Sequence, residues 1–575
     1  MDSKNVVCQN CKADFTIEPD DFGFYEKIKV PPPTWCPHCR YVRRLLDRNE
    51  YNFYKRKCDA TGENIISIYR ADAPFPVYNQ DYWKSDAWDE FSYGRNYDFG
   101  KSFFEQYEEL RRMVPHLALV NSNSVNSEYT NQANNNKDCY MFFTSTDAEK
   151  CMYGSWCHYC FFCSDCYMAE RSEFCYECIN ITKCSNCAWS QDCSDSVNVY
   201  FSSDCRGCTD CFGCVGLRTK QYYWFNENMG KEEYKKRIKN FSWDNSSIQE
   251  AKEKFSKFRL KFPFKYYHGF QAKIFSGDYM ENVERSRVAF NCRDNKDVAY
   301  MQDAWDRTED CRDCTEIILG ELSYEIQGVE TPHRTIVARS CLNTITDSFY
   351  CDMCFGVNNC FGCFGLKNNR QYCILNKQYS KEDYNKLKEK IIKHMRSTKE
   401  WGEYFPSSLS PFAYNESMAQ DYFPLTKEEA ISKGFTWYDR PITNYEITMT
   451  STDLPKTVTE TTDNILKEVV RCKTQENEES LKNNPLCTTA FRFTSLELQL
   501  YRKLGISVPE YCFSCRRTAR FKFRNPRRLW HRQCMCDKEN HFHGKEKCQV
   551  EFETSYAPER PEIVYCERCY QQEVY

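Results

Sequence analysis

The residues best suited to chemistry in this chain are cysteines that stand in pairs with two residues between them. Cys8 and Cys11 form one pair, and Cys36 and Cys39 form another after 24 intervening residues. Each pair can give two thiolates to one ion, and four thiolates complete the closed tetrahedral shell of a structural zinc site. The spacing therefore predicts an N-terminal zinc ribbon with no coordination position left open for catalysis.

The same pattern returns near the C-terminus when the sequence is shifted by 476 positions. This shift superimposes the pair Cys36 and Cys39 on Cys512 and Cys515. Cys8 has no counterpart at that shift, and the cysteine that completes the set lies beyond a polar insertion. The ligands predicted for this second ribbon are Cys472, Cys487, Cys512 and Cys515.

The C-terminal copy carries four further cysteines that are all missing from the N-terminal copy, namely Cys536, Cys548, Cys566 and Cys569. Joint absence is expected of the ligands of one site, because a partial set would leave thiols with no ion to coordinate. We therefore expect a third site and about three structural zinc ions per chain. His541, His543 and Cys534 compete as ligands there, although Cys534 matches the solitary Cys58 and is interpreted as a packed thiol.

Between these ribbons, residues 136–216 repeat themselves every 27 residues, with cysteine at four positions of each repeat and aspartate before the first. A fixed period with small buried-type residues and short strand-like runs is typical of a parallel β-solenoid. We expect one coil per 27-residue repeat. Asp138, Asp165 and Asp192 are interpreted as turn residues.

The repeated cysteines could bind metal or pack as small hydrophobic groups. Stacked coils lie about 4.8 Å apart, so Cys157 and Cys160 could face Cys184 and Cys187 in a four-thiolate site. Without bound cations, however, adjacent thiolates would repel one another, and a neutral thiol is an ordinary core side chain. Packing is the favoured interpretation.

The middle of the chain is duplicated at an offset of 149 to 150 residues, as CFGCVGL at 211–217 and CFGCFGL at 360–366 show. The predicted fold class is mainly β and multidomain, with two parallel β-solenoid lobes, flanking zinc ribbons and short helical segments. The expected domains are an N-terminal ribbon module (1–100), a cysteine-rich lobe with helices (101–270), a second lobe with a helix (271–400), a connector (401–471) and a C-terminal ribbon module (472–575).

Length and composition limit the number of domains, the type of partner and the cellular location that we expect. The 575 residues exceed what one core usually supports, and the net charge of −4 argues against a generally basic, nucleic-acid-coating protein. Neither a signal sequence nor an apolar run of membrane-spanning length is visible, so we expect a cytoplasmic protein without membrane contact. In a reducing compartment the 38 cysteines should be thiols or metal ligands rather than disulfides.

Cations interleaved with aromatic residues could still provide a local nucleic-acid-binding face, because such mixtures neutralise phosphates and stack on bases. The C-terminal module is the best candidate. The residues predicted to form this face are Arg516, Arg517, Arg520, Lys522, Arg524, Arg527, Arg528, Trp530 and Arg532.

Four parts of the sequence carry a resemblance to a known family. They are VPPPTWCPHCR with RRLLDRNE, PFPVYNQDYWKSDAWDEFSYGRNYDF, DYFPLTKEEA, and RNPRRLWHRQC with ERPEIVYCERCY. Over nearly its whole length the chain resembles the large cysteine-rich zinc-ribbon proteins of uncultured candidate-phylum bacteria. The resemblance implies zinc ribbons and no particular activity.

The sequence favours a non-enzymatic zinc-binding protein, whose ribbons bind nucleic acid or a protein partner from a rigid solenoid scaffold. Two alternatives are an enzyme that uses a cleft of the solenoid and a metal-thiolate store. The nine histidines and scattered carboxylates stand in no recognisable catalytic motif. The oligomeric state is not predicted.

Overall fold

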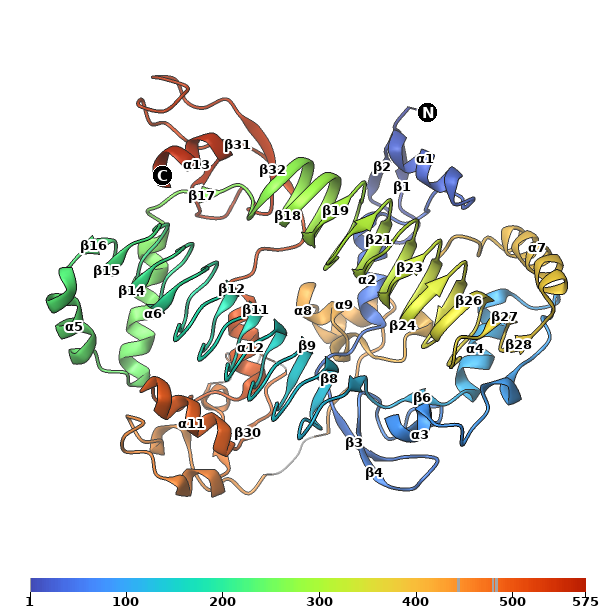
Figure 1. Cartoon of the computed structure of the whole chain (residues 1–575), viewed down its shortest axis with the longest axis horizontal. Helices are drawn as coiled ribbons and strands as arrows, with labels where there is room; N and C mark the ends of the chain where they lie inside the picture. Colours follow the sequence, from blue (N-terminus) through green and yellow to red (C-terminus); the bar gives the residue numbers. More distant parts are fainter. Residues whose placement is uncertain (1, 442–444, 478–479, 481–483, 485, 575) are drawn as a thin grey trace.

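The computed structural model describes residues 2–574, apart from 442–444, 478–479, 481–483 and 485. Figure 1 shows two ladders of strands in the middle of the chain, with hairpins and short helices around them. We call these ladders the first stack (residues 121–224) and the second stack (residues 269–374). Within the described residues, every helix is too short or too polar to cross a membrane.

The first stack consists of short strands that pair in parallel. They are β7 (Asn121–Ser122), β8 (Thr130–Asn134), β9 (Phe142–Thr146), β10 (Ser155–His158), β11 (Tyr167–Glu170), β12 (Ile179–Thr182), β13 (Val197–Tyr200), β14 (Thr209–Phe212) and β15 (Gln221–Trp224). Paired residues are 12 positions apart, as Ser155 with Tyr167 and Tyr167 with Ile179 show. The predicted 27-residue spacing between stacked strands is therefore wrong.

The second stack is built in the same way and with a similar spacing. Its strands are β18 (Gly269–Arg293), β19 (Asn295–Lys296), β20 (Thr308–Glu309), β21 (Arg312–Ile318), β22 (Tyr324–Glu330), β23 (Pro332–His333), β24 (Ile336–Thr346), β25 (Phe349–Asp352), β26 (Phe355–Phe361) and β27 (Gln371–Ile374). Cys314 of β21 pairs with Ile326 of β22, again 12 positions away.

A three-residue rhythm underlies both stacks. In long runs of each stack, residues at every third position have positive φ values, among them Asp138, Asp165 and Asp192 at 54°, 57° and 57°. Aspartate and asparagine tolerate this left-handed conformation better than most residues. The prediction that these aspartates are turn residues is confirmed.

The cysteines of the first stack follow the same rhythm and face its interior. They form a core in which Cys151, Cys157 and Cys163 are completely buried. At the corresponding interior of the second stack, Ile326 and Val329 stand among the cysteines. Aliphatic side chains and thiols are thus used alike to fill these narrow cores.

Helices cover the stacks on their outer sides. They are α4 (Phe103–Met113), α5 (Gly230–Asn240), α6 (Asn245–Arg259) and α7 (Lys381–Ser397). Ser102 caps α4 by accepting the N–H of Glu105. Phe103 of α4 packs edge-on against Phe361, so α4 covers the second stack.

The two ends of the chain consist of hairpins and short helices. The N-terminal part contains β1 (Lys4–Val7), β2 (Asp14–Ile17), α1 (Pro19–Lys27), α2 (Pro37–Leu46), β3 (Tyr54–Lys57), β4 (Asn64–Ser67), β5 (Val77–Tyr78) and α3 (Gln80–Lys84). The C-terminal part contains β29 (Val470–Arg471), β30 (Ala490–Phe491), α11 (Ser495–Leu504), α12 (Phe513–Phe521), β31 (Trp530–Gln533), β32 (Glu551–Thr554), β33 (Val564–Tyr565) and α13 (Glu567–Val574). Between the stacks lie α8 (Ala419–Tyr422) and α9 (Lys427–Ser432) (Figure 1).

Two of these helices dock on the stacks in a crossed arrangement. The N-terminal helix α2 contacts β21 and β22 of the second stack. The C-terminal helix α12 lies against the first stack, where Phe521 packs edge-on against Tyr167 of β11. In Figure 1, α2 is drawn next to β21 and α12 next to β11. Each end of the chain is therefore attached to the stack that is farther away in sequence.

Candidate metal centres and the docked arginine helices

The first group of possible metal ligands is built by the N-terminal hairpin and the start of α2. Cys8 directly follows β1, Cys11 lies in the turn before β2, Cys36 caps the N-terminus of α2 and Cys39 lies in its first turn. Their four sulfurs lie within 4.8 Å of one another. The sulfurs of Cys11 and Cys36 are 3.7 Å apart, close to the value of about 3.8 Å expected for tetrahedral Zn–S bonds of about 2.3 Å.

The second group repeats this construction at α12. Cys472, Cys487, Cys512 and Cys515 lie within the same limit of 4.8 Å, with 3.7 Å between the sulfurs of Cys472 and Cys515. The N–H of Cys512 donates to Cys472 Sγ at 3.2 Å, as the N–H of Cys36 donates to Cys8 Sγ. Cys472 is therefore the structural counterpart of Cys8. A hydrogen bond from the Cys487 thiol lowers the pKa of Cys472 to about 7, which favours the thiolate that a metal needs.

The C-terminal segment contains two further groups rather than one. One is formed by Cys534, Cys548, Cys566 and Cys569, and the other by Cys536, His541, His543 and Cys569. The sequence-based set had Cys536 in the first of these groups and treated Cys534 as a packed thiol. In the structure Cys534 Sγ accepts the backbone N–H of Cys566 at 3.2 Å. A separate hydrogen bond between the Cys534 and Cys566 side chains lowers the pKa of Cys566 to about 5.

The solitary Cys58 explains why sequence comparison favoured the other choice. Its sulfur accepts the N–H of Asn79 at 3.3 Å, in the same way that Cys534 accepts the N–H of Cys566. Cys58 thus keeps a local hydrogen bond without any partner thiols, and its survival says nothing about the role of Cys534. With four groups among the described residues, the number of possible sites is about four and not three.

The cysteines inside the stacks take no part in these four groups, which were found among the described residues. Each of these thiols instead donates to backbone carbonyls. Cys157 Sγ lies 3.4 Å from the carbonyl oxygen of Ser155 and 3.5 Å from that of Cys166. Strand pairing sets Cys157 opposite Ala169, so the four-thiolate site imagined with Cys184 and Cys187 does not match the register.

The arginines predicted to bind nucleic acid are mostly not on a free surface. Arg516, Arg517 and Arg520 are each only 5% exposed. Arg527 pairs with Asp303, and Arg524 donates to the backbone carbonyl of Asp421. Arg532 donates to the carbonyls of Tyr556 and Ala557, and Trp530 is half-buried. Of the predicted residues, Lys522 and Arg528 are exposed. The expectation of a broad basic face is therefore wrong.

The arginines of α12 are neutralised by an acidic residue inside the first stack. Asp165 is completely buried and lies 3.0 Å from Arg516 and 2.6 Å from Arg520. Burial alone would raise the pKa of Asp165, but the two guanidiniums outweigh this effect and hold the pKa below its usual value. A buried charge of this kind is stable only when it is paired and hydrogen-bonded.

The arginines of α2 repeat these contacts on the second stack. Arg40 and Arg44 are 1% and 0% exposed and reach Asp313 at 2.8 Å and 3.4 Å. Both also approach the buried Glu325. Since Arg40 and Arg44 match Arg516 and Arg520 at the 476-residue shift, the same ion-paired interface occurs twice in the molecule.

Neighbouring aromatic residues confirm that the two interfaces are copies. Tyr300 donates to Asp21 at 2.9 Å, and Tyr153 donates to Glu497 at 2.8 Å. The rings of Tyr25 and Tyr324 are 5.4 Å apart, and those of Tyr176 and Tyr501 are 5.5 Å apart. The acidic acceptors were missed at the sequence level, because nothing distinguishes Asp165 from the equally spaced Asp138 and Asp192.

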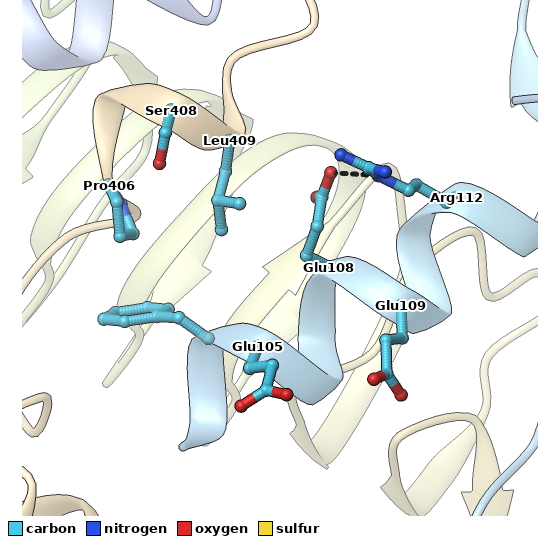
Figure 2. A pocket seen from close by; sticks show the side chains of 8 residues that line it. Glu105, Glu108, Glu109, Arg112, Pro406, Ser408 and Leu409 are labelled. Atoms are coloured by element: carbon cyan, nitrogen blue, oxygen red, sulfur yellow. Dashed lines mark hydrogen bonds and ion pairs between the residues drawn. The ribbon is translucent and has the colours of Figure 1, made fainter. Parts of the chain in front are cut away.

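Two shallow hollows on the surface were considered as enzyme sites. The one in Figure 2 has a volume of about 410 Å³ and lies between α4 and residues 406–409. Two of its three carboxylates are engaged in ion pairs, since Glu108 pairs with Arg112 at 2.7 Å and Glu109 pairs with Lys101 at 2.5 Å. The other hollow, of about 610 Å³, is lined by polar residues of the second stack between 282 and 319. Neither lining includes a cysteine or histidine among the described residues.

Comparison with known proteins adds little. No protein-family model matches the chain, and no curated protein matches it. Among solved structures, it aligns with a crystal structure described as a "putative acetyltransferase" from Desulfovibrio desulfuricans G20, at 12% identity and a TM-score of 0.11. The alignment covers 46% of this chain and 69% of the other.

Proposed function

We propose that this protein is a non-enzymatic zinc protein in which metal-bound cysteine groups fix two arginine helices onto a pair of β-solenoid lobes with 12-residue coils. The 12-residue strand register and the repeated left-handed residues support the solenoid geometry. Four cysteine-rich ligand groups support the binding of metal. Zinc suits them best, because thiolates and imidazoles in closed tetrahedral sets are its preferred ligands.

The observation that carries this proposal is the direct linkage of the first two ligand groups to the docked helices α2 and α12. Cys36 and Cys39 lie at the start of α2, and Arg40 and Arg44 follow within the next two turns. An ion at the cysteines would hold the N-terminus of the helix, and the helix would then aim its arginines at buried Asp313. The metal would serve the architecture, since four protein ligands leave no position for a substrate.

This proposal gives the arginines an intramolecular role and leaves a smaller surface for partners. Nucleic acid would have to bind through Lys522 and Arg528, which are the exposed cations of the predicted face. Two cations give weak, strongly salt-dependent attraction to phosphates. A protein partner on the assembled scaffold is therefore the better-supported reading of the binding role. All 38 cysteines are free, which is compatible with a reducing compartment.

The test uses the full chain purified under reducing conditions, with metal content measured by elemental analysis and helix protection measured by hydrogen exchange. Cys36→Ser should lose one zinc per chain and expose the amides of α2 to exchange. Cys151→Ser is a matched control, because Cys151 is equally buried but belongs to the core of the first stack. If chelation removes all metal and α2 remains as protected as before, the architectural role of the metal is refuted.

A further inference from the structure

Two ligand groups at the C-terminus have one cysteine in common. Cys569 belongs both to the set with Cys534, Cys548 and Cys566 and to the set with Cys536, His541 and His543. All ligand atoms within each set lie within 4.8 Å of one another. One sulfur is therefore within coordination reach of two different positions for an ion.

The environment of Cys569 fits a sulfur between two centres. It lies in the first turn of α13, is completely buried, and has thiol neighbours on both sides. The neighbouring thiols are those of Cys566, Cys536 and Cys548. Two adjacent cations would stabilise the Cys569 thiolate, because metal binding deprotonates a coordinating thiol.

The two histidines each turn one ring nitrogen toward Cys536 at the second position. His541 Nε2 lies 3.1 Å from a carboxylate oxygen of Glu573, and its Nδ1 lies 3.1 Å from Cys536 Sγ. His543 Nδ1 lies 2.5 Å from the carbonyl oxygen of Glu546, and its Nε2 lies 3.4 Å from the same sulfur. Each ring thus has an oxygen near its outer nitrogen and turns its inner nitrogen toward Cys536 Sγ, which is the arrangement expected of a zinc-ligating histidine.

The helix α13 supplies both the shared sulfur and one of these outer acceptors. Glu573 follows Cys569 by four residues, so both side chains lie on one face of the helix. A carboxylate behind a ligating histidine is the usual arrangement around protein-bound zinc. The loop with His541 and His543 and the helix α13 therefore both contribute to the second ion position.

We propose that the C-terminal segment holds a binuclear zinc cluster in which the Cys569 thiolate bridges the two ions. Cys534, Cys548 and Cys566 complete the shell of one ion, and Cys536, His541 and His543 complete the shell of the other. This inference rests on the proposed function, because it assumes that these groups bind zinc. In the loaded cluster five thiolates face two divalent cations, with a net charge of −1.

The test replaces zinc by Co²⁺ in the full-length protein and compares the cobalt content with the number of paramagnetic centres. Two high-spin Co²⁺ ions joined by one thiolate couple antiferromagnetically, so their resonance signal is lost at low temperature. The wild-type chain should bind four Co²⁺ ions, but the integrated electron paramagnetic resonance signal should correspond to two. The two isolated cysteine groups give this remaining signal.

The variant His543→Ala sharpens the experiment, because it removes a ligand from one ion only. It should bind three Co²⁺ ions, and the signal should rise to three spins since the remaining C-terminal ion no longer has a coupled neighbour. His531→Ala is the control, because His531 is exposed on β31 and belongs to neither ligand group. It should behave as the wild type.

The possible results separate this inference from the function on which it rests. Four bound ions with four spins would refute the bridge while leaving metal binding intact. Three bound ions in the wild type would show a single C-terminal centre and would equally refute it. A wild-type chain that binds no cobalt or zinc would overturn the proposed function as well.

Discussion

Replacing Asp165 by Asn removes the carboxylate that contacts both Arg516 and Arg520 at the docking site of α12. The three side chains are 0%, 4% and 6% exposed, so water cannot take over the lost role. Asn is nearly isosteric with Asp and tolerates the left-handed backbone of residue 165, where φ is 57°. The substitution therefore changes the charge and leaves the shape almost intact.

The expected cost follows from leaving buried guanidiniums unpaired. Removal of one partner from a buried ion pair typically costs about 3–5 kcal/mol. Arg516 retains a hydrogen bond to the carbonyl of Tyr511 at 2.8 Å and lies 3.8 Å from Glu497, which places the expected value near the lower limit. At about 1.4 kcal/mol per factor of ten, undocking of α12 should become at least a hundredfold more frequent.

Hydrogen exchange measured by mass spectrometry on the full chain is the suitable assay, because it reports the opening of α12 without global unfolding. The amides of residues 513–521 should exchange about one hundred to several thousand times faster in Asp165→Asn. Asp195→Asn is a matched control, since Asp195 has a similar backbone conformation in the same stack but is exposed. It should change exchange by less than threefold.

A single result would refute this reasoning. If α12 in Asp165→Asn exchanges within threefold of α12 in Asp195→Asn, the ion pairs do not hold the helix on the first stack. The apolar contacts of α12, such as that between Phe521 and Tyr167, would then have to account for docking.

Three other predictions concern pH, the core thiols and the exposed cations. Burial would lower the pKa of His268, but Asp278 and Asp192 outweigh it and raise this pKa to about 9. The stabilisation by His268 should therefore be complete below about pH 6.5 and disappear as the pH rises through 9. The midpoint of urea unfolding should fall over this pH range in the wild type, and His268→Ala should lack this fall. Cys178→Ala should cost about 1 kcal/mol in urea unfolding through lost packing, with the metal content unchanged by elemental analysis; loss of an ion would contradict the core assignment. Lys522→Glu combined with Arg528→Glu should abolish any low-salt gel shift without changing the circular dichroism, whereas Arg516→Glu should lower the unfolding midpoint; a gel shift that persists in the double variant would contradict this division.

Much of the cysteine chemistry could be predicted because ligand spacing is local. The pairs Cys36 with Cys39 and Cys512 with Cys515 each lie across one turn at the start of a helix, and that geometry depends on a few residues. The assignment of Cys534 and Cys536 could not be predicted in the same way. The two residues are separated by Met535 alone, yet their sulfurs belong to different groups. Cys534 Sγ accepts the N–H of Cys566, whereas Cys536 Sγ faces His541 and His543.

The strand spacing was missed for a different reason. Interior positions recur every third residue, and both 12 and 27 are multiples of three. A 27-residue repeat therefore keeps Cys139, Cys166 and Cys193 in the core without setting them opposite one another in the strand register. Sequence repeats report which side chains face the interior, whereas strand register depends on backbone pairing, such as that between Cys157 and Ala169.

The arginines were misjudged because their partners lie far away in sequence. A run of cations looks the same whether it faces solvent or a buried carboxylate, and Asp165 is 351 residues from Arg516. The pairing of Arg40 with Asp313 spans 273 residues. Sequence patterns of short range contain no information about such contacts.

The crossed docking also has a consequence for how the chain is made. At about 5–20 residues per second, a ribosome needs about 14 to 55 s to reach Asp313 after Arg40 has been synthesised. During that interval α2 has no acceptor, and the first stack waits even longer for α12. Two nascent chains on one messenger could therefore bind each other. The helix α2 of one chain fits the second stack of the other chain, and α12 fits the first stack of the other chain. A metal-loaded N-terminal hairpin that folds alone would keep α2 ordered until its own acceptor is complete, so zinc supply during synthesis should decide between a closed monomer and chains that exchange their halves.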